Sequence, residues 1–105
     1  MVTNNNMSLD SLKAKLCARA AKQSETTEYE NGLIGLLSKQ PYCNCQTVKE
    51  LADFMECERL HIKNVEMKKV EKLETVEMVD ENRRLYKEAH KLFMYVAICE
   101  EILKE

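Results

Sequence analysis

The chain has 105 residues and a formal net charge of −2; 45% of its residues are hydrophobic and 32% are charged. That length suits one domain with one modest core, and this balance of apolar and charged residues excludes a disordered chain. The slightly acidic charge also excludes a protein that holds nucleic acid by overall positive charge, so such binding would need local basic patches.

The location of the protein is predicted from its first residues and its apolar runs. No secretory signal precedes the first cysteine, and the longest apolar run, residues 92–99, is far too short to span a bilayer. We therefore expect a cytoplasmic protein without a membrane contact, in which the cysteines are reduced. The five cysteines are Cys17, Cys43, Cys45, Cys57 and Cys99.

The first part of the chain predicts two helices. Residues 1–7 are polar and indicate a flexible tail, so a single helical domain is expected over 8–105. Ser8 can cap a helix over 9–22, in which apolar residues recur at helical spacing. The other face of that helix is basic, with Lys13, Lys15 and Arg19. A second helix is expected over 29–39, before Pro41.

The next segment indicates a helix, a tight turn and a second helix. Thr47 and Glu50 have the spacing of a capping box. Apolar residues then recur at helical spacing, and we expect Cys57 and Leu60 on the core side of a turn. The sequence therefore predicts a helix-turn-helix over 47–73. The inner apolar residues are Val48, Leu51, Ala52, Met55, Ile62 and Val65.

Residues 75–86 admit two interpretations. Thr75–Val79 is rich in β-branched residues, 80–82 suit a turn, and Arg83–Tyr86 could return as a second strand. Alternatively, the absence of Gly and Pro after Pro41 favours long helices throughout, with a broken heptad seam from Ile62 to Asp80.

The last segment, 88–104, predicts a helix whose apolar face is too wide to be covered from one side. A second subunit often covers such a face, so we expect a homodimer. The predicted dimer interface consists of Leu92, Phe93, Val96, Cys99 and Leu103.

Together, residues 29–104 resemble the winged helix-turn-helix family, through the TVKELA start at Thr47, the apolar offsets that follow and the possible hairpin. The resemblance implies a mainly α fold with a short β-hairpin and a small dimeric DNA-binding protein, a transcriptional regulator. It places a recognition helix over 58–73, whose Arg and Asn side chains could read bases, and a wing carrying two arginines. The implied DNA-binding residues are Arg59, His61, Lys63, Asn64, Lys68, Arg83 and Arg84, with phosphate contacts from Lys13, Lys15 and Arg19.

Two other functions are open. An all-α helical bundle could be a protein–protein interaction module, an adaptor or an inhibitor that does not bind DNA. A less favoured alternative is a zinc site made of Cys43, Cys45, Cys57 and His61, since three thiolates and an imidazole suit tetrahedral zinc. We expect no cofactor and no enzyme activity, because no phosphate loop, nucleophile elbow or paired-histidine motif occurs.

Overall fold

The protein is mainly α-helical in a computed structural model, which describes residues 6–22, 27–70 and 76–104. Side chains are described for 6–22, 27–68 and 79–104. No β-strand occurs in these ranges, and none of their helices is long and apolar enough to cross a membrane. The elements are α1 (Leu9–Lys22), α2 (Glu28–Leu36), the 3₁₀ turn η1 (Tyr42–Asn44), α3 (Val48–His61), the π-helical turn η2 (Ile62–Glu66), α4 (Met67–Val70) and α5 (Val76–Leu103).

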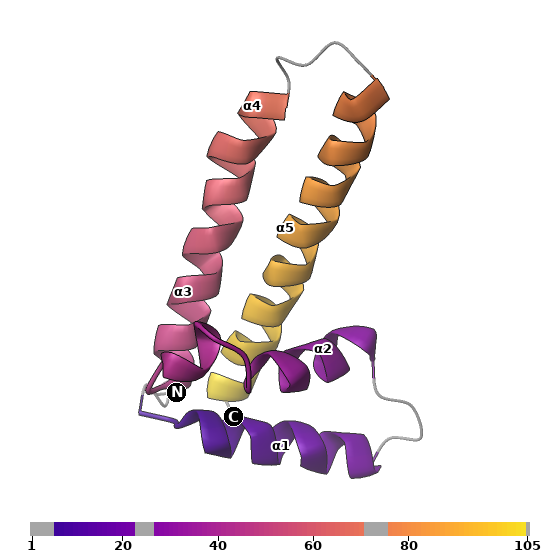
Figure 1. The fold of residues 1–105 in the computed structure, drawn as a ribbon. Coiled ribbons are helices and arrows are strands. Elements are labelled where there is room, and N and C mark those ends of the chain that lie inside the picture. Colours follow the sequence, from indigo (N-terminus) through magenta and orange to yellow (C-terminus); the bar gives the residue numbers. More distant parts are fainter. Residues whose placement is uncertain (1–5, 23–26, 71–75, 105) are drawn as a thin grey trace.

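The helices form a long antiparallel hairpin on a two-helix base (Figure 1). The segments α3, η2 and α4 follow one another along one line, and α5 returns beside them. The helices α1 and α2 lie across the lower end of this hairpin, near both termini. The molecule is accordingly elongated, with extents of 47 × 30 × 27 Å. We call residues 59–70 and 76–93, which extend away from the base, the arm.

The core lies at the base, where all four long helices meet. Its side chains come from the apolar faces that the helical spacing predicted, and burial of each contributes roughly 1.5–3 kcal/mol. The predicted flexible tail lies outside the described residues except for Asn6 and Met7, and Met7 is buried against this core. The side chains with the least exposure are Leu12, Leu16, Leu33, Val48, Leu51, Met55, Leu92, Cys99 and Ile102.

Local capping bonds fix where the helices begin. The hydroxyl of Thr47 accepts a hydrogen bond from the Glu50 N–H at 3.2 Å, and the Glu50 carboxylate accepts one from the Gln46 N–H at 2.7 Å. Ser8 Oγ accepts one from the Ser11 N–H at 3.2 Å. The predicted caps of α1 and α3 are thus confirmed. The Val48 N–H also donates to the Met7 carbonyl at 2.8 Å, which joins the starts of the two helices.

The predicted helix-turn-helix is wrong, because α3 continues through the expected turn. Residues 53–58 are helical, and η2 and α4 continue the helix without a break up to Val70. No Gly or Pro interrupts this stretch, and the good helix former Glu56 pairs with Arg59 one turn later. Leu60, expected on the core side, is 41% exposed.

The predicted wing is also wrong where it is described. Val76–Val79 and Arg83–Tyr86 both lie inside α5, and Thr75 lies outside the described residues. The residues around Asp80 are mostly good helix formers, an Arg84–Glu81 pair forms at i, i+3, and Leu85 is buried. These gains outweigh the strand preference of a few β-branched residues. The alternative of an all-α fold is confirmed.

Candidate functional site

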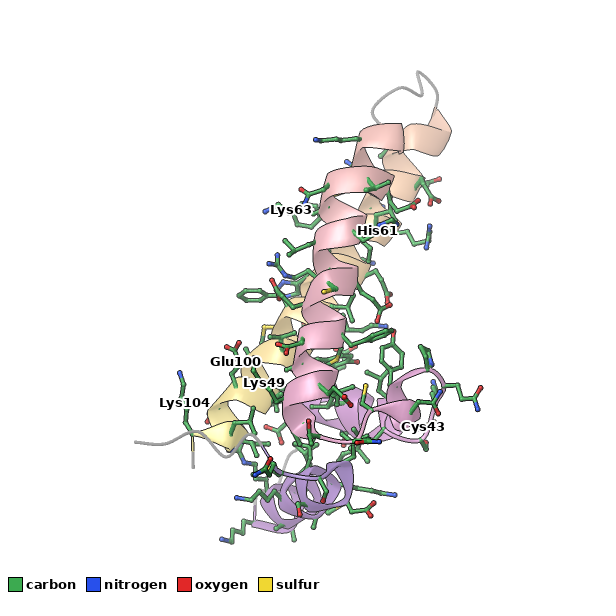
Figure 2. The ribbon with its side chains drawn as sticks, turned by 90° about the vertical axis from the view of Figure 1, so that its left-hand side faces the viewer. Cys43, Lys49, His61, Lys63, Glu100 and Lys104 are labelled. Atoms are coloured by element: carbon green, nitrogen blue, oxygen red, sulfur yellow. The ribbon has the colours of Figure 1, made fainter. Side chains whose placement is uncertain are left out.

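The arm separates the predicted DNA-binding residues onto different sides. Figure 2 shows Lys63 and His61 leaving the helix in different directions. Lys63 faces a hollow shared with α5, whereas His61 lies beside Glu58 and 3.4 Å from the Glu66 carboxylate. The residues do not form one reading face. Of the set Arg59, His61, Lys63, Asn64, Lys68, Arg83 and Arg84, all but Arg59 are exposed.

One hollow of about 180 Å³ lies between the two helices of the arm. The π-helical turn η2 lies on one side of it, and π-helical turns are often found at functional sites. The hollow combines aromatic, thioether and cationic side chains, a lining that suits an apolar group next to a negative charge. Its lining residues are Arg59, Lys63, Met67, Tyr86, Ala89, His90 and Phe93.

A cation and an aromatic ring form the base-proximal wall of this hollow. The Arg59 guanidinium carbon lies 5.7 Å from the centre of the Phe93 ring. Arg59 Nε also donates to both carboxylate oxygens of Glu56, at 3.2 and 3.1 Å. That hydrogen bond lowers the pKa of Glu56 and raises the pKa of Arg59. The Glu56 bonds thereby hold the charged Arg59 side chain beside the ring, and the Glu56 carboxylate compensates part of its charge.

A second hollow continues the first toward the tip of the arm, because Tyr86 lines both. Val79, Tyr86 and Phe93 are spaced seven residues apart on α5 and are 52%, 69% and 51% exposed. They form an apolar line that runs beside the cations Arg83 and Lys87. We call the lining of both hollows the arm face: Arg59, Lys63, Met67, Val79, Asn82, Arg83, Tyr86, Lys87, Ala89, His90 and Phe93.

This face does not emerge from the winged-helix interpretation, because a wing over 75–86 divides α5 into a hairpin and a shorter helix. The heptad spacing of Val79, Tyr86 and Phe93 was the signal that could have found it. Near the lower end of the face, the His90 ring meets the Tyr29 ring of α2 edge-on, with 5.8 Å between their centres.

The predicted dimer interface is mostly core. Leu92, Val96, Cys99 and Leu103 are buried within one chain, and only Phe93 is exposed. The wide apolar face of α5 is therefore covered by the chain's own helices, chiefly α3 and α2. Burial raises the pKa of the Cys99 thiol to about 12, in keeping with a core position.

The remaining candidates lie near the base. In the parts of the chain that the structure describes, no three His, Cys, Asp or Glu side chains gather as a metal site, so Cys43, Cys45, Cys57 and His61 do not come together. Among the basic residues of α1, Arg19 lies 3.7 Å from Glu101, while Lys13 is exposed and Lys15 is half-buried.

Comparison with known protein families, with curated proteins and with solved structures found no match. The likeness to winged helix-turn-helix proteins thus rests only on the residues that suggested it. Two of the structural elements it implies, the turn and the wing, are replaced by helix. The function is accordingly argued from the arm itself.

Proposed function

We propose that this protein is a helical interaction module that binds another protein through the arm face, acting as an adaptor or an inhibitor. The observation that carries the proposal is the apolar line of Val79, Tyr86 and Phe93, each at least half exposed. Covering large apolar side chains is favourable, at about 25 cal/mol per Å² of apolar surface removed from water. Contiguous exposed apolar surface with a polar rim is typical of protein interaction sites.

The composition of the face supports the same function. Binding energy at protein interfaces is concentrated in Tyr, Trp and Arg side chains that sit in pockets. Here Tyr86 borders both hollows, and Arg59 makes a cation–π contact with Phe93 beside one of them. A helical hairpin also holds such side chains at fixed spacing, so little conformational freedom is lost when a partner binds.

DNA binding, which the resemblance implies, fits this arm less well. Contacts to the phosphate backbone are made by polar donors, and exposed aromatic or aliphatic side chains contribute nothing to them. Two arginines of the predicted reading surface, Arg59 and Arg84, are already paired with Glu56 and Glu81. DNA remains a prediction that the experiment below tests directly.

The proposal is tested by selecting helical peptides from a displayed random library. The wild-type protein is the bait, and a Tyr86→Ala/Phe93→Ala variant removes peptides that bind elsewhere. The control is Leu60→Ala/Val65→Ala, which alters two exposed apolar side chains of the arm that border neither hollow. Circular dichroism establishes that each variant keeps its helix content.

We expect enriched peptides that bind wild type and the control equally and bind the double variant at least about tenfold more weakly, since aromatic hot spots dominate interface energy. Enrichment of no peptide that depends on Tyr86 and Phe93 would contradict the proposal. A contrary result is that the protein binds mixed duplex DNA at micromolar concentration and low salt, and loses that binding in a Lys63→Glu/Arg83→Glu variant. That result would replace the proposed interaction module with a DNA-binding protein.

A further inference from the structure

We infer that the partner of the arm face presents an amphipathic α-helix whose flank is acidic. This inference rests on the proposed function and adds the chemistry of the partner. It draws on two observations about the face: the length of its apolar line, and the sign of the charges beside that line.

The length fits a helix of three to four turns. Val79 and Phe93 are fourteen positions apart, which is about 21 Å along a helix at 1.5 Å per residue. A partner helix that lies along α5 can place apolar residues against this line at i, i+3, i+4 and i+7 spacing. The hollow of about 180 Å³ between Tyr86, Phe93 and Met67 has room for one large side chain of that helix.

The charges beside the line are positive. Lys63, Arg83 and Lys87 form no ion pair within the described part of the chain, although five pairs of other Lys or Arg side chains with carboxylates occur there. Among the described residues that line the two hollows there is no Asp or Glu. The chain as a whole is acidic, so this face has the opposite sign to the rest of the molecule. A partner with Glu or Asp flanking its apolar residues complements it.

The same charges disfavour a second copy of this chain as the occupant. A two-fold contact through the face would be isologous, with each copy presenting the same residues to the other. The Arg83 and Lys87 side chains of both copies would then enter one interface, and like charges brought together oppose association. An acidic helix of a different protein meets no such repulsion.

The experiment compares two labelled synthetic helical peptides by fluorescence anisotropy. Both have leucine at the apolar positions; one has glutamate and the other lysine at the flanking positions. The test variant is Lys63→Glu/Arg83→Glu/Lys87→Glu. The matched control, Lys13→Glu/Lys22→Glu/Lys104→Glu, changes the net charge by the same amount on exposed residues of the base and the C-terminal end. Sedimentation of each protein reports its oligomeric state.

We expect the glutamate peptide to bind wild type on the order of tenfold more tightly than the lysine peptide. The glutamate peptide can form three exposed ion pairs, with Lys63, Arg83 and Lys87, that the lysine peptide cannot form. The arm variant should reverse the preference, the control variant should keep it, and added salt should weaken it. Equal binding of both peptides, or an unchanged preference in the arm variant, overturns the inference.

The two proposals fail in different ways. Library peptides that depend on Tyr86 and Phe93 but lack acidic flanks would leave the interaction module standing and overturn the acidic partner. If wild type forms a dimer that dissociates in the Tyr86→Ala variant, the occupant of the arm face is a second copy of this chain. That result would overturn the acidic partner. Duplex DNA bound more tightly than the glutamate peptide, through the same three cations, would overturn both.

Discussion

Of the two glycines in the chain, Gly32 is the one at which an added methyl group should be costly. A Cβ at Gly32 would lie 2.2 Å from Tyr95 Oη, 3.1 Å from Cζ and 3.4 Å from Cε1. Tyr95 is 4% exposed, so its ring has little room to move. The missing Cβ is what lets α2 cross so close to α5. Overpacking of this kind costs about 1–3 kcal/mol, because side chains or backbone must shift.

Gly35 provides the matched control. It lies in the same helix, and a Cβ there would meet nothing within 4 Å. Both substitutions gain helix propensity, up to about 1 kcal/mol from Gly to Ala. The difference between Gly32→Ala and Gly35→Ala therefore isolates the steric cost. We expect Gly35→Ala to be as stable as wild type or more so, and Gly32→Ala to be less stable than Gly35→Ala by about 1–3 kcal/mol.

The assay is urea unfolding followed by circular dichroism, which gives the free energy of unfolding of each variant. Gly32→Ala should destabilise the Tyr95→Phe variant less than it destabilises wild type. Without the Tyr95 hydroxyl, the atom nearest to the added Cβ is Cζ at 3.1 Å. Equal stability of Gly32→Ala and Gly35→Ala would refute the packing of α2 on α5 described above.

Two further predictions concern the thiols and a half-buried hydrogen bond. Ellman's reagent should modify the three exposed thiols quickly, half-buried Cys45 more slowly and Cys99 only after unfolding. Burial raises the pKa of both Cys45 and Cys99, which lowers the fraction of reactive thiolate. A fast-reacting Cys99 in the folded protein would contradict its core position. Tyr42 Oη donates to Glu58 Oε2 at 3.0 Å, and Glu58 Oε1 has no partner, so Tyr42→Phe should cost about 1–3 kcal/mol and Glu58→Gln less. Burial, and next the hydrogen bond to Glu58, raises the pKa of Tyr42 above its ordinary 10.0. The stabilising effect of the Tyr42 hydroxyl is therefore present below pH 10 and is lost as the pH rises further. A stability difference between wild type and Tyr42→Phe that stays constant above pH 10 would contradict this. The exposed thiols are Cys17, Cys43 and Cys57.

The local features of the fold could be predicted from sequence. The caps at Ser8 and Thr47 depend only on neighbouring residues, and the inward-facing residues of α1 and α3 follow helical spacing. The helix-turn-helix failed because a tight turn needs a residue that breaks the helix. Glu56 instead continues the helix and pairs with Arg59.

Long-range packing decided what the sequence pattern left open. The wide apolar face of the last helix was assigned to a second subunit, but α2 and α3 cover it within one chain. Gly32 permits part of that contact, through its close approach to Tyr95. Likewise, Val79 and Tyr86 line one face only because α5 is continuous from Val76. Both outcomes depend on how helices meet, which spacing along the chain does not specify.

The most direct test of the central claim is a titration of ¹⁵N-labelled protein with a helical peptide that depends on Tyr86 and Phe93. We predict helical backbone shifts through residues 53–58 and 79–86. We also predict peptide-induced changes concentrated at Lys63, Tyr86 and Phe93, with α1 unaffected. Changes confined to the base, or extended-strand shifts over 79–86, would contradict an arm that binds its partner through this face.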